Sequence, residues 1–265
     1  MRAALLLYRA YCAGSWGVQR RYPAAMCIWV LGVALEPVLY LAVWHTAAGG
    51  GQLGGFSGGD FAAYYLLVML VNHVSYTWFF MVMDRRVREG GFSALLLRPV
   101  HPLHGDIAEN LTFKAITAVA VVPMAVLLCL TMEVRFRLGV LDLTLAAPSV
   151  LTGAVLRMSL EWTLSLAALW TTRVESFGRV YGFVSHFLGG FAAPLTALPA
   201  ALHATASWTP FPWMVAFPVE LAMGRHPAAE AVRGLLVQAG WLVASLVLLR
   251  TVWRRALRRH TAVGG

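Results

Sequence analysis

The sequence predicts an all-α, polytopic membrane protein that forms a single transmembrane domain over residues 1–265. Hydrophobic residues make up 59% of the chain and charged residues 12%, which is about half the charged content of soluble domains. A membrane-spanning helix needs about 20 apolar residues, and six such segments are predicted here. The composition excludes a soluble enzyme, and it excludes an intrinsically disordered chain because disorder requires low hydrophobicity.

The N-terminal third is predicted to contain a surface helix and two spans. Residues 1–23 mix leucine and aromatic side chains with arginine, a composition typical of an interfacial helix on the membrane surface. Spans one and two occupy residues 24–83, at about Ala24–Ala48 and Phe61–Met83. The seven glycines of Gly49–Asp60 indicate a flexible loop between them.

The middle of the chain is predicted to contain one non-spanning segment and three spans. Residues 84–105 are polar and amphipathic and include two prolines, so they do not cross the membrane. Spans three to five occupy residues 106–198, at about Ile107–Met132, Leu143–Thr171 and Val180–Leu198.

Residues 199–230 are apolar but interrupted by prolines. No piece between these prolines is long enough to cross, and broken backbone at membrane depth is tolerated only where protein buries it. We therefore expect two short re-entrant or interfacial outer helices between spans five and six. Span six follows at residues 231–253, and residues 254–265 form a basic tail.

The distribution of arginine predicts that both termini are cytoplasmic. The net charge is +9, and in a membrane protein this excess indicates the cytoplasmic side rather than a nucleic-acid partner. The predicted inner segments carry Arg2, Arg9, Arg20, Arg21, Arg85, Arg86, Arg88, Arg98, Arg173, Arg179, Arg250, Arg254, Arg255, Arg258 and Arg259. The predicted outer segments carry Arg135, Arg137, Arg225 and Arg233.

Four charged residues fall within predicted spans: Glu36, Lys114, Arg157 and Glu161. Each costs at least about 2.5 kcal/mol at mid-membrane, so each needs a partner or a wet cavity. Arg157 and Glu161 are four residues apart and can pair on one helix, whereas Lys114 could reach Glu109 or extend to the inner surface. These residues either line a substrate path or proton relay, or fix helix packing through ion pairs.

The sequence contains no pattern that predicts a catalytic residue, a metal site or a cofactor site. Lys114, the single lysine, follows Phe113 rather than glycine, so it does not belong to a phosphate-binding loop. Gly55–Gly59 matches G-x-S-x-G, but it lies in a glycine-rich loop without the strand that the catalytic motif requires. We therefore predict a non-enzymatic chain.

The order of elements and two motifs resemble the permease subunit of a bacterial type-2 ABC exporter over the whole chain. The first motif runs from Val87-Arg88-Glu89-Gly90 to Leu95-Leu96-Leu97-Arg98-Pro99-Val100-His101-Pro102-Leu103, and the second is the proline-rich stretch 194–218. The tail Arg259-His260-Thr261-Ala262-Val263-Gly264-Gly265 is also similar. Gly91 and Thr209 depart from the family pattern.

The resemblance implies two permease subunits, either a homodimer or a related heterodimer, each docked on a separate ATPase subunit that holds ATP and Mg²⁺. It implies the bacterial cell (inner) membrane, with membrane lipid as a further partner. It places a cytoplasmic coupling helix between spans two and three, within Asp84–Leu103. The implied ATPase-coupling residues are Arg85, Arg86, Arg88, Glu89, Phe92, Leu95, Leu96 and Arg98. The implied outer-gate residues are Pro194, Pro199, Trp208, Pro210, Phe211, Trp213 and Pro218.

The expected function is export of a hydrophobic or amphiphilic compound along a path lined by spans one, two and five. Another interpretation of Asp84–Leu103 is that it lies on anionic lipid. A second class of function is an ion- or proton-driven carrier using Glu36, although no internal repeat of the carrier type is evident. An intramembrane enzyme and a non-transporting scaffold are further alternatives. Association with an ATPase discriminates the permease from all three.

Overall fold

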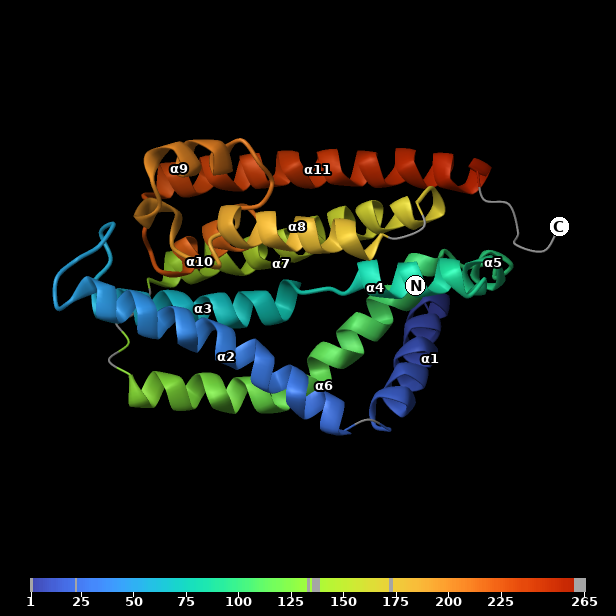
Figure 1. Ribbon diagram of the computed structural model, residues 1–265, viewed down its shortest axis with the longest axis horizontal. Coiled ribbons are helices and arrows are strands. Elements are labelled where there is room, and N and C mark those ends of the chain that lie inside the picture. Colours follow the sequence, from blue (N-terminus) through green and yellow to red (C-terminus); the bar gives the residue numbers. More distant parts are fainter. Residues whose placement is uncertain (1, 22, 133, 135–138, 172–173, 260–265) are drawn as a thin grey trace.

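The computed structural model describes residues 2–21, 23–132, 134, 139–171 and 174–259, which form a bundle of α-helices without a β-strand (Figure 1). This confirms the predicted all-α class. Five segments are long and apolar enough to cross a membrane, which identifies a multi-pass membrane protein. They are Met26–Ala48, Gly58–Arg88, Pro102–Thr131, Val140–Leu169 and Ala228–Arg258.

The first half of the chain contributes six helices. They are α1 (Arg2–Gln19), α2 (Pro23–Ala48), α3 (Gly58–Ser75), α4 (Phe79–Arg88), α5 (Gly91–Leu96) and α6 (Pro102–Thr131). In Figure 1, α1 runs across the bundle rather than along it. It packs against the start of α6, where the Tyr8 hydroxyl lies 2.9 Å from His104 Nδ1.

The second half contributes two long helices and several short ones. They are α7 (Val140–Ser165), the 3₁₀ turn η1 (Leu166–Leu169), α8 (Glu175–Leu188), η2 (Leu195–Ala197), α9 (Ala200–Ser207), α10 (Ala216–Ala222) and α11 (Ala228–Arg259). The two short helices predicted in the proline-rich segment are α9 and α10, and both lie at the end of the bundle opposite α5 (Figure 1).

Two of the predicted spans need correction. The helix predicted over Phe61–Met83 is interrupted, because α3 ends at Ser75 and α4 begins at Phe79. The helix predicted over Val180–Leu198 is also wrong, because α8 begins at Glu175 and ends at Leu188. Gly189 and Gly190 follow α8, and Gly190 has φ +85°, a conformation that favours glycine. The apolar residues beyond them therefore do not continue the helix.

Among the described residues, the two largest of the five buried apolar clusters lie toward opposite ends of the bundle. The one near α9 is built mainly from α3, α7 and α10 and contains Phe61, Tyr64, Tyr65, Leu156, Val215 and Val219. The one near α5 is built from α4, α7 and η1 and contains Phe79, Met83, Phe92, Trp162 and Leu166. Arg135, Arg137, Arg173 and residues 260–265 of the predicted basic tail lie outside the described residues.

Candidate functional site

The helix break between α3 and α4 is held together by polar side chains from α6 and α7. A break at membrane depth frees backbone groups that must find other partners. Lys114 Nζ donates to the Val74 carbonyl at 2.5 Å, and Asn110 Nδ2 donates to the Tyr76 carbonyl at 3.2 Å. The Thr77 hydroxyl donates to Glu161. The break is therefore a supported feature of the fold.

Arg157 and Glu161 form the ion pair that their spacing predicted. Arg157 Nε donates to Glu161 Oε1 at 2.8 Å, and both side chains are buried. Arg157 Nη1 also donates to Asn72 Oδ1 at 2.8 Å and to Ser75 Oγ at 3.3 Å. The pair thus binds the end of α3 to α7, as the packing interpretation of these two charges expects.

The expected positions of Lys114 were wrong. The ammonium group of Lys114 neither pairs with Glu109 nor extends to the inner surface. It donates to the Val74 carbonyl at the helix break instead. Nothing in the sequence spacing of α6 predicts this contact, because it depends on an interruption in another element. Asn72, His73, Ser75 and Thr77 give a local signal, since four polar side chains so close together are unusual within a predicted span.

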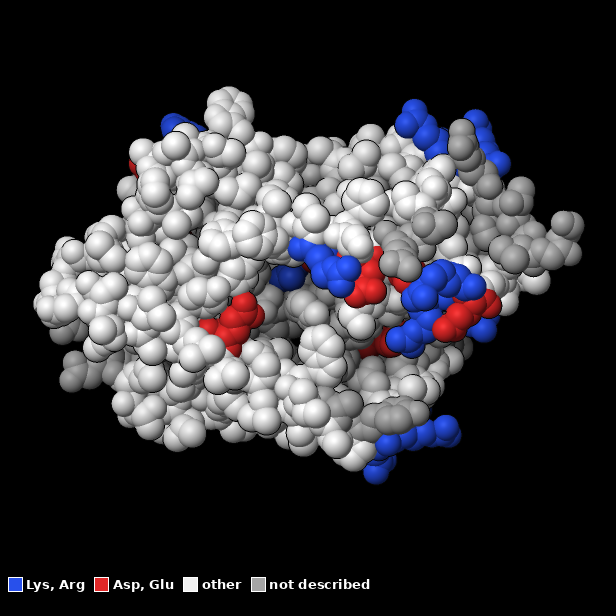
Figure 2. Space-filling model, viewed as in Figure 1, with Lys and Arg blue, Asp and Glu red and all other residues white. Residues whose placement is uncertain are grey.

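A cleft of about 290 Å³ opens beside the break. One wall comes from the break, α4 and α7, and the other comes from α8. The lining residues include Tyr76, Thr77, Phe80, Arg157, Glu161, Gly178, Tyr181 and Ser185. At its rim, Arg179 and Glu175 form an exposed ion pair at 3.5 Å. Figure 2 shows this hollow in the middle of the face, with basic atoms at its floor.

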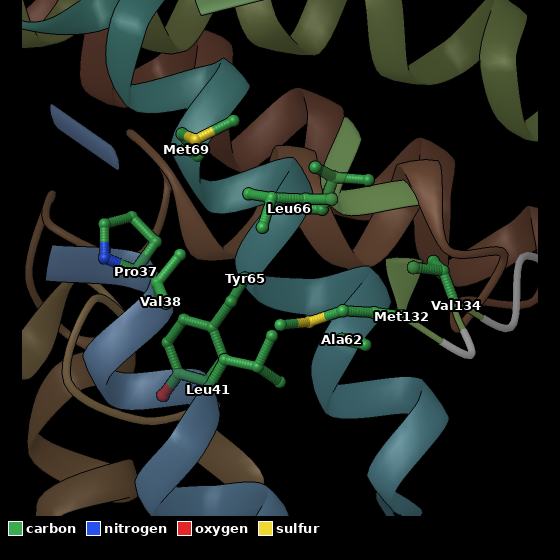
Figure 3. A pocket seen from close by; sticks show the side chains of 10 residues that line it. Pro37, Val38, Leu41, Ala62, Tyr65, Leu66, Met69, Met132 and Val134 are labelled. Carbon is green, nitrogen blue, oxygen red and sulfur yellow. The ribbon is translucent and has the colours of Figure 1, made fainter. Parts of the chain in front are cut away.

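A second pocket, between α2, α3 and the end of α6, has a different character (Figure 3). Its side chains are apolar apart from the Tyr65 hydroxyl, and it has room for only about 10 Å³, roughly one water molecule. It is a packing gap, whereas the cleft combines space with charge.

The predicted coupling segment forms a sharp bend, which we call the elbow and define as residues 84–98. Gly90, with φ +73°, makes the turn from α4 into α5. Asp84 and Asp106 are buried and act as internal anchors. Arg88 pairs with Asp84 at 2.7 Å and Arg86 pairs with Asp106 at 2.6 Å. Asp84 also accepts the Val174 N–H at 3.1 Å, and Asp106 accepts the Trp162 Nε1–H at 2.9 Å.

The structure separates the predicted coupling residues into an outer and an inner group. Arg85, Arg88, Glu89 and Arg98 are exposed, and they are joined by Leu97, whose residue surface is 88% exposed. Leu95 is half-buried. Phe92 and Leu96 pack in the core at this end, and Phe92 is fully buried beside Trp253. Phe92 therefore anchors α5 within this chain and does not face outward, since a short amphipathic helix buries its apolar face on whichever surface is nearest.

The predicted outer-gate residues also separate. Trp208 and Pro199 are exposed at the end that carries α9. Phe211 and Trp213 pack against the core, and Gln238 Nε2 donates to the Trp213 carbonyl at 2.7 Å. Pro194 and Pro218 are buried, and Pro210 is half-buried. Of the predicted outer-gate aromatic residues, Trp208 is therefore exposed, whereas Phe211 and Trp213 pack against the core.

Glu36 lies on α2 and faces α8. Its carboxylate is 3.4 Å from His186 Nδ1, and His186 Nε2 is 2.7 Å from the Tyr40 hydroxyl. His186 and Tyr40 were not among the predicted site residues, because they come from helices far apart in the sequence. The four-residue spacing of Glu36 and Tyr40 was a usable signal, since it places both side chains on one face of a helix.

Residues 31–264 match the model of a protein family described as ABC-2 family transporter protein. Neither the comparison with curated proteins nor the comparison with solved structures gave a match. The family match covers every element of the break, the cleft and the elbow.

Proposed function

Because the chain belongs to the ABC-2 family of transporters, we propose that it is the transmembrane permease subunit of an ATP-driven exporter. A permease of this family works with an ABC ATPase, which supplies the ATP and Mg²⁺ chemistry. The proposed cargo is a hydrophobic or amphiphilic compound. The cleft supports this choice because it combines aromatic walls with a charged floor.

The observation that carries the proposal is the position of α4. This ten-residue helix is about 15 Å long, and it joins the elbow at one end to the helix break at the other. Thr77, just before α4, binds Glu161 at the floor of the cleft. Asp84, near the other end, is fixed to Arg88 and to the backbone of Val174. Because α4 packs against α7, α8 and η1, a displacement of the elbow is transmitted to the cleft as a rigid movement.

The proposed topology has six crossings with both termini in the cytoplasm of a bacterial cell. Five crossings are the long apolar segments, and α8 makes the fifth in chain order although its 14 residues span only about 21 Å. The start of α1 and the end of α11 lie at the same end of the bundle as the elbow (Figure 1). The arginine bias assigns this end to the inside, with α1 on the inner membrane surface.

The path is proposed to run between two permease subunits. The cleft opens on the face formed by α2, the α3–α4 segment and α8, which correspond to spans one, two and five. A second permease, identical or related, would close this face, and membrane lipid would cover the others. The charged floor supports this arrangement because a buried ion pair next to an open cleft is costly in lipid.

The proposal is tested by co-expressing this chain with ABC ATPase subunits of the same organism and co-purifying the complex. The test variant is Arg88→Asp with Leu97→Asp, which changes two exposed elbow residues. The matched control is Arg254→Asp with Arg255→Asp, two exposed residues of α11 at the same end of the bundle. We expect wild type and the control to form a complex that hydrolyses ATP, and the elbow variant to lose assembly or hydrolysis by at least about tenfold.

If no ATPase associates with the wild-type chain, the permease proposal falls. If the elbow variant assembles and hydrolyses ATP like wild type, the ATPase does not dock on the elbow. The proposed role of α4 in transmitting movement from the elbow to the cleft is then wrong.

A further inference from the structure

Glu36 is an acidic residue within the apolar helix α2, and no arginine or lysine pairs with it in the described part of the chain. It lies at the middle of α2, and its side chain is 52% exposed. Glu161, Asp84 and Asp106 each have an arginine partner. The ionisable group found against Glu36 is His186, which carries a charge only when protonated.

The contacts of His186 fit a ring that carries a proton on Nδ1. Its Nε2 lies 2.7 Å from the Tyr40 hydroxyl, which can donate a hydrogen bond to it. Its Nδ1 lies 3.4 Å from the Glu36 carboxylate, and an unprotonated nitrogen would repel that oxygen. The ring is held by Phe191, which stacks on it at 5.7 Å and 13°. His186 thus orients Glu36, whose side chain stays 52% exposed.

Glu36, Tyr40 and His186 lie next to the cleft but do not line it. The connection runs through Phe191, which stacks on His186 and whose ring lies 5.5 Å from the guanidinium carbon of Arg157 in the cleft. Ser185, next to His186 in α8, lines the cleft, as does Tyr76. Tyr76 also contacts α2, because its ring lies 6.0 Å from that of Trp29. A carboxylate with aromatic rings nearby is the arrangement that recognises organic cations.

The remaining charges of the cleft disfavour an anionic ligand. Arg157 is occupied by Glu161, Asn72 and Ser75, and Arg179 pairs with Glu175. An anion would have to break one of these pairs, whereas a cation finds the carboxylate of Glu36 half exposed. Holding that carboxylate at membrane depth is costly, and a bound cation would remove part of the cost.

We propose that Glu36, oriented by His186 and Tyr40, binds the cationic head group of an amphiphilic cargo whose apolar part occupies the cleft. This assignment rests on the proposed function, since it names the substrate class of the same permease. It gives Glu36 a binding role in place of a proton-carrying one.

The test uses the full chain, without an ATPase, in nanodiscs of a neutral phosphatidylcholine. The probes are tetraphenylphosphonium and tetraphenylborate, which share a shape and differ in charge sign. Binding is measured by equilibrium dialysis, with protein-free nanodiscs subtracted. The test variant is Glu36→Gln, and the control is Glu175→Gln, which neutralises an exposed acid at the rim of the cleft.

We expect Glu36→Gln to weaken phosphonium binding at least about tenfold and to leave borate binding unchanged or stronger. Glu175→Gln should change phosphonium binding less than about twofold. A second variant, His186→Phe, keeps the carboxylate but removes its orienting group, and should weaken phosphonium binding about threefold.

The proposal is overturned if wild type fails to bind the phosphonium or prefers the borate, or if Glu36→Gln binds it like wild type. Equal losses for both probes also overturn it, because they indicate a change in shape rather than charge. Since no ATPase is present, these outcomes are independent of the co-purification test: a chain that couples to an ATPase but ignores the cation keeps the proposed function and loses this inference.

Discussion

The two ends of α4 use the same kind of ion pair in opposite ways. At the elbow, the side chain of Asp84 is 7% exposed and that of its partner Arg88 is 62% exposed, while Arg86, the partner of the buried Asp106, is 23% exposed. At the helix break, both partners are buried, with Arg157 at 11% and Glu161 at 4%. A buried acid paired with an exposed arginine holds a positive charge at a defined place on the surface. A fully buried pair instead holds two helices together inside the bundle.

This difference in exposure indicates which end of α4 can bind another protein. Arg88 has guanidinium nitrogens available at the surface, so the elbow can bind another protein without losing its internal anchors. The Arg157 guanidinium donates hydrogen bonds to Glu161, Asn72 and Ser75. Such bonds compensate a buried ion pair for its loss of contact with water. The break is therefore a fixed floor, and the elbow is a contact surface joined to it by α4.

Arg157→Met should have the largest effect, because it leaves Glu161 buried without its counter-charge. Breaking a buried pair in this way costs about 3–5 kcal/mol, so we expect a severe loss of folded protein in detergent. The measurement is the yield of monodisperse protein and its Tm. Arg157→Met combined with Glu161→Leu should recover much of the loss, since it removes both charges. A double variant less stable than the single one would contradict the view of this pair as a structural unit.

Asp106→Asn should loosen the elbow while the break stays intact. The new side-chain amide can still accept the Trp162 N–H, but it cannot form the ion pair with Arg86, and a hydrogen bond to a charged group contributes about 1.5–3 kcal/mol. We expect faster amide hydrogen exchange over residues 79–105 and little change in α3. Glu230→Gln, an exposed acid in the first turn of α11, is the control. Equal acceleration in α3 would show that the two ends of α4 are not separate units.

The sequence predicted the local features of both ends but not the contacts between distant elements. The pair of Arg157 and Glu161 followed from four-residue spacing on one helix. The prolines and charges of residues 84–105 predicted a segment that does not cross the membrane, but they did not predict its bend at Gly90. The break was missed because none of its residues is a strong helix breaker; Lys114 and Asn110 stabilise it from another helix. Phe92 was placed on the wrong side because an amphipathic pattern shows that a face is covered, but not by what.

The same limit explains α8. Apolar residues continue past Leu188, so composition extends the predicted span, whereas Gly189 and Gly190 end the helix through backbone geometry. The small-residue pair Gly178 and Gly182 also looked equivalent in the sequence. In the structure, a Cβ on Gly178 would lie 2.7 Å from Phe80 Cγ, while a Cβ on Gly182 would have no atom within 4 Å.

Gly178→Ala and Gly182→Ala therefore test how tightly α8 is held on α4. Overpacking costs about 1–3 kcal/mol, so Gly178→Ala should lower the Tm and push α8 away from Phe80. Gly182→Ala should be neutral or slightly stabilising, because alanine restricts the unfolded chain. Parallel thermal unfolding of the two variants in detergent makes the measurement. If both behave alike, α8 is not packed on α4 closely enough to transmit a displacement to the cleft.

The smallest effect is expected from His101, which links the elbow to α6 and α11. Its Nδ1 accepts the Leu103 N–H at 3.2 Å, and its ring lies 4.4 Å from that of Trp253. Burial lowers the pKa of His101, an effect that His104 reinforces and Asp106 opposes. A folded-state pKa below the ordinary value of about 6.5 means that the folded protein binds fewer protons, so stability falls as the pH drops below that value.

We expect acidification from about pH 7.5 to 5.5 to lower the Tm of wild type more than that of His101→Asn, which can still cap α6 but does not titrate. His104→Gln removes an exposed neighbour that reinforces the lowered pKa of His101, so it should weaken the pH dependence, but less than His101→Asn does. A His101→Asn variant with an unchanged pH profile would show that the acid sensitivity arises elsewhere. A smaller fall in Tm on acidification would show that His101, next to the elbow, contributes to the acid sensitivity. The ion pair at the break, at the other end of α4, would then not be its main source.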